Sequence, residues 1–386
     1  MIFAEKRQLR IPGPTPIPPQ ILRAGAQPMM GHRSGDFVEL CQRVAAKVKT
    51  VFQTENDVFI LTSSGTGALE AAVANTVSPG DQVLVLVSGV FGERFVKIAN
   101  AYGAQVETIR CQFGHAIDPQ TVTDALVKKP EIKVVFATHC ETSTGVVNDL
   151  EKIAEAVHSS LGDPLLVVDT VSSMGGIEFK TDKWGIDLVV SGSQKAFMLP
   201  PGLAFIGVSD RSWDIIEANQ SPRFYFDLRA YRKSLPKGQT PFTPAVSLFY
   251  QLEEALAMME AEGFANIYQR HLLMRDMVRA AVRALGLPLF VAEDNNASAT
   301  VTSILGPQGL DVEALRKLLN QKYKLVLAGG QADLKGKIFR IGHMGFAEPT
   351  DMLAVLATLE LGLVELGWKL EGGAAVRAAE EVLVRG

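Results

Sequence analysis

The chain is poor in cysteine. Its 386 residues contain only three, Cys41, Cys111 and Cys140, which are odd in number and far apart. A disulfide framework, a zinc site or an iron–sulfur site needs cysteines at short, paired spacings. We therefore expect no metal centre and no disulfide scaffold, and we interpret the three cysteines as ordinary thiols.

Long apolar runs and runs of one charge are also lacking. No apolar run approaches the roughly 18 residues that a membrane span needs, and residues 1–7 carry charge where a signal peptide has its apolar core. The 38 basic and 42 acidic residues give a net charge of −4 without a long block of either sign. We therefore expect a cytoplasmic protein whose partners are small molecules rather than nucleic acid or a membrane.

Short apolar segments separated by helical patterns, in contrast, are frequent. Between residues 37 and 210 they lie at 57–61, 82–87, 133–137, 165–168, 187–190 and 203–208. Continuous apolar strands that alternate with helices are typical of a mainly parallel sheet covered on both faces. The 47% hydrophobic content is enough for a substantial core.

Proline and helix-forming residues mark the divisions of the chain. Five prolines between residues 10 and 20 predict an extended segment that is neither a helix nor a central strand. Residues 247–285 lack proline and predict one or two long helices, with a domain boundary near residue 260. We expect an N-terminal extended arm over 1–20, a large domain over 21–260 and a small C-terminal domain over 261–386.

The small domain is expected to mix strands and helices. The strands are predicted at 299–304, 323–328 and 337–341, and the helices at 312–320 and 350–366. The alanine- and glutamate-rich residues 372–386 predict a final, exposed helix. This part of the chain therefore reads as a smaller α+β unit.

Ser64-Gly65-Thr66 follows a predicted strand and opens a predicted helix. Hydroxyl and glycine N–H groups at a positive helix N-terminus favour phosphate binding, although a plain strand-to-helix turn has the same pattern. A dinucleotide-binding loop would need a small residue at Glu70 and an acid near Ser88, and a P-loop would need a Gly-Lys-Ser/Thr motif. Neither requirement is met.

Asp169 and Lys195 each follow the end of a predicted buried strand, where open parallel sheets bind ligands. A carboxylate there can pair with a ring nitrogen, and an amine in apolar surroundings has a lowered pKa and forms imines. The plainer interpretations are a helix N-cap for Asp169 and a surface lysine for Lys195.

Three further features have the same double interpretation. Phe91 lies between glycines after a strand and could stack on a flat ring or belong to the core. The cluster 139–145 offers hydroxyls and His139, although a lone histidine is usually structural. Arg340, in an alternating strand, could bind a carboxylate in bidentate fashion or face solvent. An amine, a carboxylate and a guanidinium at one cleft are what pyridoxal phosphate chemistry on amino acids needs.

The order of phosphate loop, aromatic residue, hydroxyl cluster, Asp169, Lys195 and the distant Arg340 resembles the class V aminotransferases of pyridoxal phosphate fold type I. Within them, the chain is similar to the alanine-glyoxylate and serine-glyoxylate aminotransferases over about residues 8–370. The resemblance implies an α/β fold with a mainly parallel seven-stranded sheet, helices on both of its faces and a smaller C-terminal α+β domain. It also implies a homodimer with shared active sites.

By this resemblance, Lys195 would form the internal aldimine with pyridoxal 5′-phosphate and move the substrate's α-proton, while Asp169 would pair with the ring nitrogen. Phe91 would stack on the ring and Thr142 would bond near its phenolic oxygen. The remaining cofactor contacts are assigned to Ser64, Gly65, Thr66, Val171, Gln194 and, from the neighbouring subunit, Thr240 and the stronger candidate Thr243. Gly13 and Arg340 would bind the substrate.

The implied reaction is a ping-pong transfer of an amino group from alanine or serine to glyoxylate. A relative that uses 2-aminoethylphosphonate or phosphoserine stays open because of His32, Arg33 and Arg223. A cysteine desulfurase needs a mobile nucleophilic cysteine, and none follows Cys140. A nucleotide-binding dehydrogenase, which has a different fold, would need an acidic residue near Ser88, and this chain has none there. A passive cofactor-binding protein would not need Lys195, Asp169 and Arg340 together.

Overall fold

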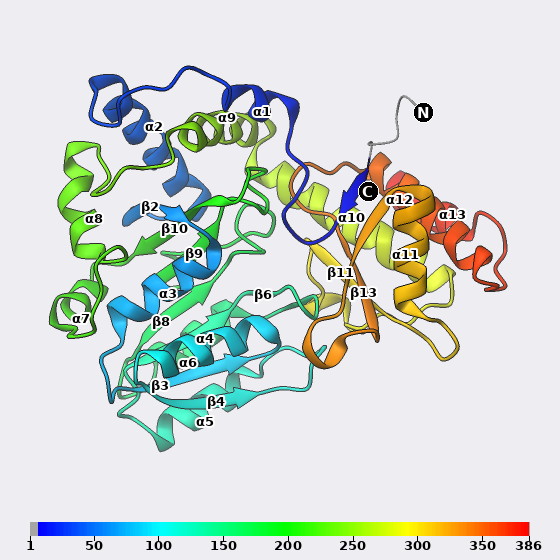
Figure 1. Cartoon of the computed structure of the whole chain (residues 1–386). Helices are drawn as coiled ribbons and strands as arrows, with labels where there is room; N and C mark the ends of the chain where they lie inside the picture. Colours follow the sequence, from blue (N-terminus) through cyan, green and yellow to red (C-terminus); the bar gives the residue numbers. More distant parts are fainter. Residues whose placement is uncertain (1–6, 386) are drawn as a thin grey trace.

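The computed structural model describes residues 7–385, which form a seven-stranded sheet, a four-stranded sheet and a short two-stranded ladder with flanking helices (Figure 1). In spatial order the large sheet contains β2 (Asp57–Ser63), β10 (Gly202–Val208), β9 (Leu188–Gly192), β8 (Leu165–Asp169), β5 (Val134–Thr138), β3 (Gln82–Val87) and β4 (Gln105–Arg110). Only β10 runs antiparallel to its neighbours. The predicted mainly parallel seven-stranded sheet is thereby confirmed.

Six strands of this sheet match the predicted apolar segments, and β4 is the one that the apolar pattern missed. Its sequence, with Gln105, Glu107 and Arg110, is largely polar. β4 pairs only with β3, so it is an edge strand. Edge strands are commonly polar because one side faces solvent, which explains why a search for buried strands did not find it.

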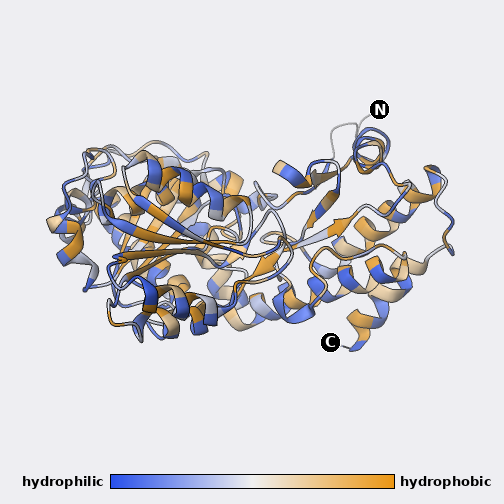
Figure 2. Cartoon of the chain, turned by 90° about the horizontal axis from the view of Figure 1, so that it is seen from below, coloured by the Kyte–Doolittle hydropathy of each residue, from blue (hydrophilic) through white to orange (hydrophobic). Residues whose placement is uncertain are grey.

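Helices cover both faces of the large sheet. One face carries α2 (Gly35–Phe52), α5 (Pro119–Lys128), α6 (Leu150–His158) and α9 (Val246–Glu262), and the other carries α3 (Gly65–Thr76), α4 (Val90–Ala101), α7 (Ser212–Ala218) and α8 (Leu228–Ser234). Alternate residues of β2 supply the two cores: Ile60 faces the first and Leu61 the second. Figure 2 shows the strands as mainly hydrophobic between helices with hydrophilic outer faces.

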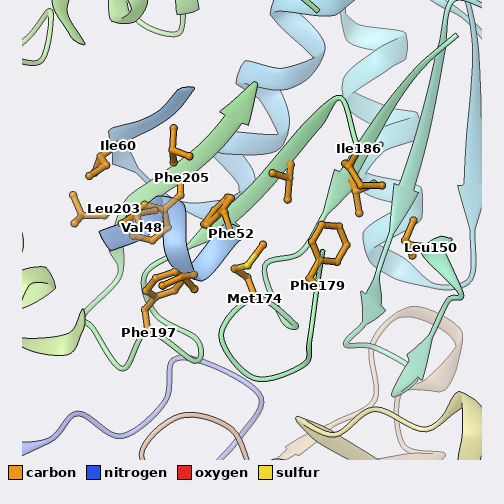
Figure 3. Packing of buried hydrophobic residues seen from close by; sticks show 14 of the residues in the cluster. Val48, Phe52, Ile60, Leu150, Met174, Phe179, Ile186, Phe197, Leu203 and Phe205 are labelled. Carbon is orange, nitrogen blue, oxygen red and sulfur yellow. The ribbon is translucent and has the colours of Figure 1, made fainter. Parts of the chain in front are cut away.

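Aromatic packing beneath the sheet fixes the loop that follows β9. The rings of Phe197 and Phe205 lie 4.7 Å apart between centroids, and Phe52 packs edge-on against Phe205 (Figure 3). All three side chains are fully buried. Since Phe197 lies two residues after Lys195, this packing anchors the loop that carries the lysine.

The small sheet has the order β1 (Gln8–Arg10), β12 (Leu325–Gly329), β13 (Ile338–Gly342) and β11 (Val301–Leu305). It packs with α10 (Phe264–Ala284), α11 (Val312–Tyr323) and α12 (Pro349–Glu365) around a third core. The remaining short elements are β6 (Cys140–Glu141), β7 (Val146–Val147), η1 (Leu235–Lys237), η2 (Asp294–Asn296) and η3 (Ala332–Leu334). The long helical region expected at 247–285 is confirmed as α9 and α10.

Both ends of the chain differ in part from the sequence prediction. The arm contributes β1 to the small sheet and then leads to α1 (Pro19–Ala24), which begins inside the segment expected to exclude a helix (Figure 1). Proline is tolerated there because the first helical residue needs no N–H partner. The predicted final helix is confirmed as α13 (Ala374–Arg385), which is exposed on one side but buries Ala375 and Ala379 against the core of the small sheet. The three-part division of the chain stays a prediction.

Candidate functional site

A cavity of about 290 Å³ lies at the carboxyl ends of the large sheet's strands. It is lined by Gly13, Pro14, Ser64, Gly65, Thr66, Leu69, Phe91, Arg94, Asp169, Val171, Gln194, Lys195 and Pro201. Most of the predicted site residues therefore meet in one place. Thr142, Arg340, Thr240 and Thr243 are not part of this lining.

Lys195 lies in the loop after β9 with its side chain 8% exposed. Its Nζ donates a hydrogen bond to the carbonyl oxygen of Pro12 at 2.6 Å. Burial lowers the pKa of the amine to about 8. Thr15 from the arm holds the same loop, since its hydroxyl donates to the carbonyl of Lys195 at 2.9 Å. The amine is therefore held in place, and it loses its proton more readily than an exposed lysine does.

Gly13 brings the arm into contact with the lysine. A Cβ at this position would stand 2.7 Å from the Nζ, Cε and Cδ atoms of Lys195. The φ of Gly13 is +142°, a region that residues with a side chain rarely adopt. Only glycine fits between the arm and the lysine at this point.

Asp169 is the last residue of β8 and is 3% exposed. Its Oδ1 accepts a hydrogen bond from the N–H of Val171 at 2.8 Å. Burial raises the pKa of the carboxyl to about 6, and the nearby charge of Lys195 opposes this shift. A buried carboxylate of this kind is stabilised by a cationic N–H group, such as a protonated ring nitrogen.

The loop between β2 and α3 forms an anion-binding end of the cavity. Ser64 is the N-cap of α3, and its hydroxyl accepts from the N–H of Gly67 at 3.3 Å. A Cβ at Gly65 would stand 2.9 Å from a methyl group of Val171, so the backbone lies close to the cavity wall. At the same end, the buried amide oxygen of Gln194 has no hydrogen-bond partner within residues 7–385. The N–H and hydroxyl groups at the start of α3 suit a phosphate ester, to which Gln194 could donate only through its amide NH₂ group.

Arg94 is a cavity residue that the sequence reasoning missed. Its guanidinium lies 4.6 Å from the ring centroid of Phe91, and its Nη1 donates to the hydroxyl of Thr66 at 3.1 Å. Within residues 7–385 it forms no ion pair with a carboxylate. Phe91 and Arg94 both lie in α4, three residues apart, so they share one helix face. That spacing was the available signal.

Arg340 lies beside the cavity rather than in its wall. Its guanidinium donates to the carbonyl of Gly329 through Nε at 3.0 Å and Nη2 at 2.7 Å, and to the carbonyl of Thr142 through Nη1 at 2.8 Å. It is 5% exposed, and burial lowers its pKa to about 10. The hydroxyl of Thr142 pairs with that of Ser172, another residue that the sequence reasoning missed.

The other predicted residues lie away from the cavity. His139 is buried between Phe179 and Trp184, and burial lowers its pKa to about 3, in line with the structural interpretation. Thr240 is buried and donates to the carbonyl of Phe242 at 2.7 Å, whereas Thr243 is exposed. Their contribution to a neighbouring subunit stays a prediction.

The lining fits pyridoxal phosphate in three respects. A fixed amine and a buried carboxylate face the same space, and a helix N-terminus with an added guanidinium forms one end of it. The unpaired amide of Gln194 lies at that end. Among residues 7–385 no group of three or more His, Cys, Asp or Glu side chains is arranged to hold a metal ion.

Comparison with known families agrees with this geometry. A family model described as "Aminotransferase class-V" matches residues 12–344. Three relatives are similar over nearly the whole chain. A protein named "Soluble hydrogenase, small subunit" from Synechococcus is 46% identical over 98% of this chain and 99% of its own length. An uncharacterized aminotransferase from Methanocaldococcus jannaschii is 44% identical, with 100% and 99% covered. The serine–glyoxylate aminotransferase of Methylorubrum extorquens is 37% identical, with 98% and 96% covered.

Two crystal structures have the same fold over almost all of the chain. The ureidoglycine-glyoxylate aminotransferase of Bacillus subtilis superimposes with a TM-score of 0.93 at 32% identity, covering 98% of each chain. The pyridoxamine-pyruvate aminotransferase of Mesorhizobium loti also gives 0.93, at 34% identity, covering 98% of this chain and 97% of its own. The predicted fold type is confirmed by these matches.

Proposed function

We propose, from the premise that this chain belongs to the class V aminotransferase family, that it moves an amino group from alanine or serine to glyoxylate with pyridoxal 5′-phosphate as cofactor. The chain is an aminotransferase by its full-length similarity to named members. The observation that carries the finer proposal is the convergence of Lys195 and Asp169 on one small cavity whose far end suits an anion.

Each cavity residue has a part in this reaction. Pyridoxal phosphate, when bound, supplies an electron sink for the negative charge that develops at the substrate's α-carbon. The carboxylate of Asp169 would hold a proton on the ring nitrogen, and Phe91 would pack against the ring. The Nζ of Lys195 takes the proton from the α-carbon and returns it, a task suited to an amine with a pKa of about 8.

The phosphate end relies on backbone and side-chain donors. The N–H groups at the start of α3, the hydroxyl of Thr66 and the amide NH₂ group of Gln194 would bind the ester oxygens. Arg94 would add a full positive charge at this end, since it already donates to Thr66. We expect this charge to matter for the dianionic ester.

Glyoxylate is the proposed acceptor because the site offers little room beyond the cofactor. Glyoxylate has no side chain, so its recognition would rest on its carboxylate and on a confined space near Gly13. Arg340 would bind that carboxylate after exchanging one of its backbone contacts. The names of the Methylorubrum and Bacillus relatives, both of which include glyoxylate, support this choice.

We further propose a cytoplasmic homodimer in which Thr240 and Thr243 reach the phosphate end of the neighbouring site. Thr243 is exposed, and the nearby Phe224 is 79% exposed, as expected of a surface that a second subunit covers. Among residues 7–385, no helix combines the length and the apolarity that crossing a membrane requires.

The other candidate reactions receive less support. Arg33 and Arg223 both donate to backbone carbonyls, and neither they nor His32 lines the cavity, so none of these three residues supplies a cation for a phosphonate donor there. Cys140 is buried, and burial raises the pKa of its thiol to about 11, which is unsuited to desulfurase chemistry.

The test of the proposed function is product analysis. Purified protein with pyridoxal phosphate is incubated with glyoxylate and, separately, alanine, serine or 2-aminoethylphosphonate. We expect equal amounts of glycine and pyruvate from alanine, or of glycine and hydroxypyruvate from serine. Glycine formation only with 2-aminoethylphosphonate would replace the proposed donor class.

A further inference from the structure

Glu141 is a fully buried carboxylate behind the cavity that the proposed reaction does not use. It is 0% exposed and lies in β6, two residues before Ser143. Its Oε2 accepts from the N–H groups of Phe91 at 3.0 Å and Gly92 at 3.2 Å. Its Oε1 accepts from the N–H of Ser143 at 3.1 Å and from its hydroxyl at 2.6 Å.

These bonds supply the cap that α4 lacks. Gly89 is the N-cap residue of α4 and has no side chain to accept from the first N–H groups of the helix. Glu141 accepts from two of them, and the hydroxyl of Ser143 accepts from Val90 at 3.0 Å. A carboxylate at this position also complements the positive end of the helix. The first turn of α4, which contains Phe91, is therefore fixed by hydrogen bonds to Glu141 and Ser143, which lie outside the helix.

Glycine at position 89 is what lets the carboxylate approach. A Cβ at Gly89 would stand 2.4 Å from Cγ and 2.5 Å from Cδ of Glu141. A residue of a neighbouring strand, rather than the N-cap residue, therefore caps α4. This arrangement ties the position of Phe91 to the segment 141–143.

The same segment holds Arg340. The carbonyl oxygen of Thr142 accepts from Nη1 of Arg340 at 2.8 Å. Arg340 is buried, and the negative charge of Glu141 opposes the fall in its pKa that burial causes. One three-residue segment therefore connects the aromatic ring on the cavity wall to the arginine of the small sheet.

We propose that Glu141 is a positioning residue for amino transfer, which sets Phe91 against the cofactor and supports Arg340 through Thr142. This inference rests on the proposed function. All four partners of the carboxylate are donors, so the ionised form is the one that the geometry requires. In Glu141→Gln, the NH₂ group would face N–H and O–H donors and could not accept from them, so about half of these hydrogen bonds would be lost.

The decisive variant is Glu141→Gln, with Asp187→Asn as its matched control. Asp187 is also a buried carboxylate that accepts a backbone N–H, from Leu166 at 2.8 Å, but its partners, which include Ser209 and Arg211, are not cavity residues, whereas Glu141 binds Phe91. The readouts are the thermal midpoint, the visible circular dichroism of bound pyridoxal phosphate, and kcat and KM for alanine. The dichroism reports how the ring is held, which a purely structural role would not alter.

We expect both variants to lower the thermal midpoint, and only Glu141→Gln to change the dichroism and to reduce kcat/KM for alanine by about 10- to 100-fold. Phe91→Ala should give a similar dichroism change, and adding Glu141→Gln to it should change the signal no further, because both act through the same ring. If Glu141→Gln does not fold, Ser143→Ala is the alternative, because it removes only the hydroxyl that binds Val90 and Glu141. We expect it to change the dichroism and kcat/KM in the same direction, but less.

The proposal is overturned if Glu141→Gln, or Ser143→Ala in its place, keeps the native dichroism and kinetics, or if the dichroism change of Glu141→Gln adds fully to that of Phe91→Ala. The wild-type enzyme separates this result from failure of the proposed function. A wild-type protein that binds no pyridoxal phosphate refutes the proposed function and the inference together. Binding without turnover on alanine leaves the dichroism test of Glu141 intact.

Discussion

The amine of Lys195 donates a hydrogen bond to the carbonyl oxygen of Pro12 at 2.6 Å, although 183 residues separate the two in sequence. Pro12 belongs to the arm that starts in the small sheet as β1 and passes across the cavity. The arm is therefore a wall of the site. The next residue, Gly13, lies so close to Lys195 that it leaves no room for a Cβ.

Gly13→Ala should impair cofactor binding. The added Cβ would stand 2.7 Å from Nζ of Lys195, and alanine disfavours the φ of +142°. We expect the dissociation constant of pyridoxal phosphate to rise by about tenfold or more, which corresponds to ~1.4 kcal/mol. Gly31→Ala is the control, because a Cβ there meets nothing within 4 Å. Equal cofactor affinity in the two variants would remove the arm from the site.

The rate of cofactor attachment should depend on pH through Lys195. Burial lowers the pKa of its amine to about 8, and only the neutral amine attacks an aldehyde. The initial rate at which the visible band of bound pyridoxal phosphate forms should rise between about pH 7 and 9 and then level off. Lys195→Ala should form no band. A rate that still rises steeply above pH 10 would mean that the lysine is not desolvated.

Asp169→Asn should stabilise the cofactor-free protein while it impairs the reaction. Burial raises the pKa of Asp169 to about 6 from 3.8, so ionising it costs stability as the pH rises through this window. At pH 7 the neutral amide avoids that cost, and we expect about 1–3 kcal/mol of added stability. The measurement is urea unfolding of both proteins at pH 4 and pH 7. A difference that is absent at pH 7 would contradict the buried carboxylate.

Arg340→Gln should weaken the use of substrates more than the binding of cofactor. Losing a buried guanidinium that pairs with a carboxylate typically costs about 2–5 kcal/mol, so kcat/KM for alanine should fall at least ~30-fold. Pyridoxal phosphate affinity should stay within about twofold. Arg316→Gln serves for comparison, since Arg316 also donates to a carbonyl of β12, that of Leu327 at 3.1 Å. Unchanged alanine kinetics in Arg340→Gln would exclude it from the site.

Arg94→Gln should weaken pyridoxal phosphate binding in a salt-dependent way. Its guanidinium donates to Thr66 at the start of α3 and has no carboxylate partner within residues 7–385. We expect about a tenfold loss of affinity at low salt and a smaller loss at high salt. Arg110→Gln is the control, because Arg110, the last residue of β4, pairs with Glu93 and does not line the cavity. If unphosphorylated pyridoxal loses affinity equally, the phosphate is not the partner of Arg94.

The residues that sequence reasoning located share a local signature. Asp169 ends an apolar run and Lys195 lies shortly after another, and the carboxyl ends of parallel strands meet at one edge of the sheet. The strand β4 lacked that signature because it is a polar edge strand. The buried face of α13 was missed because its small alanines carry little hydrophobic contrast.

Other features depend on contacts between distant segments. Nothing local to Glu141 shows that it accepts from the N–H groups of Phe91 and Gly92, about fifty positions away. The placement of Arg340 against the carbonyl of Thr142 likewise needs both sheets in position. Such relationships follow from the fold, and the fold was predictable only in outline.

The most direct test of the account is the visible absorption spectrum of the purified protein with pyridoxal phosphate, followed by addition of alanine or serine and then glyoxylate. We predict a band of bound cofactor that disappears with the donor and returns with glyoxylate, and that never forms in Lys195→Ala. A wild-type protein that stays colourless with pyridoxal phosphate, or a band that neither donor changes, would contradict the proposed reaction.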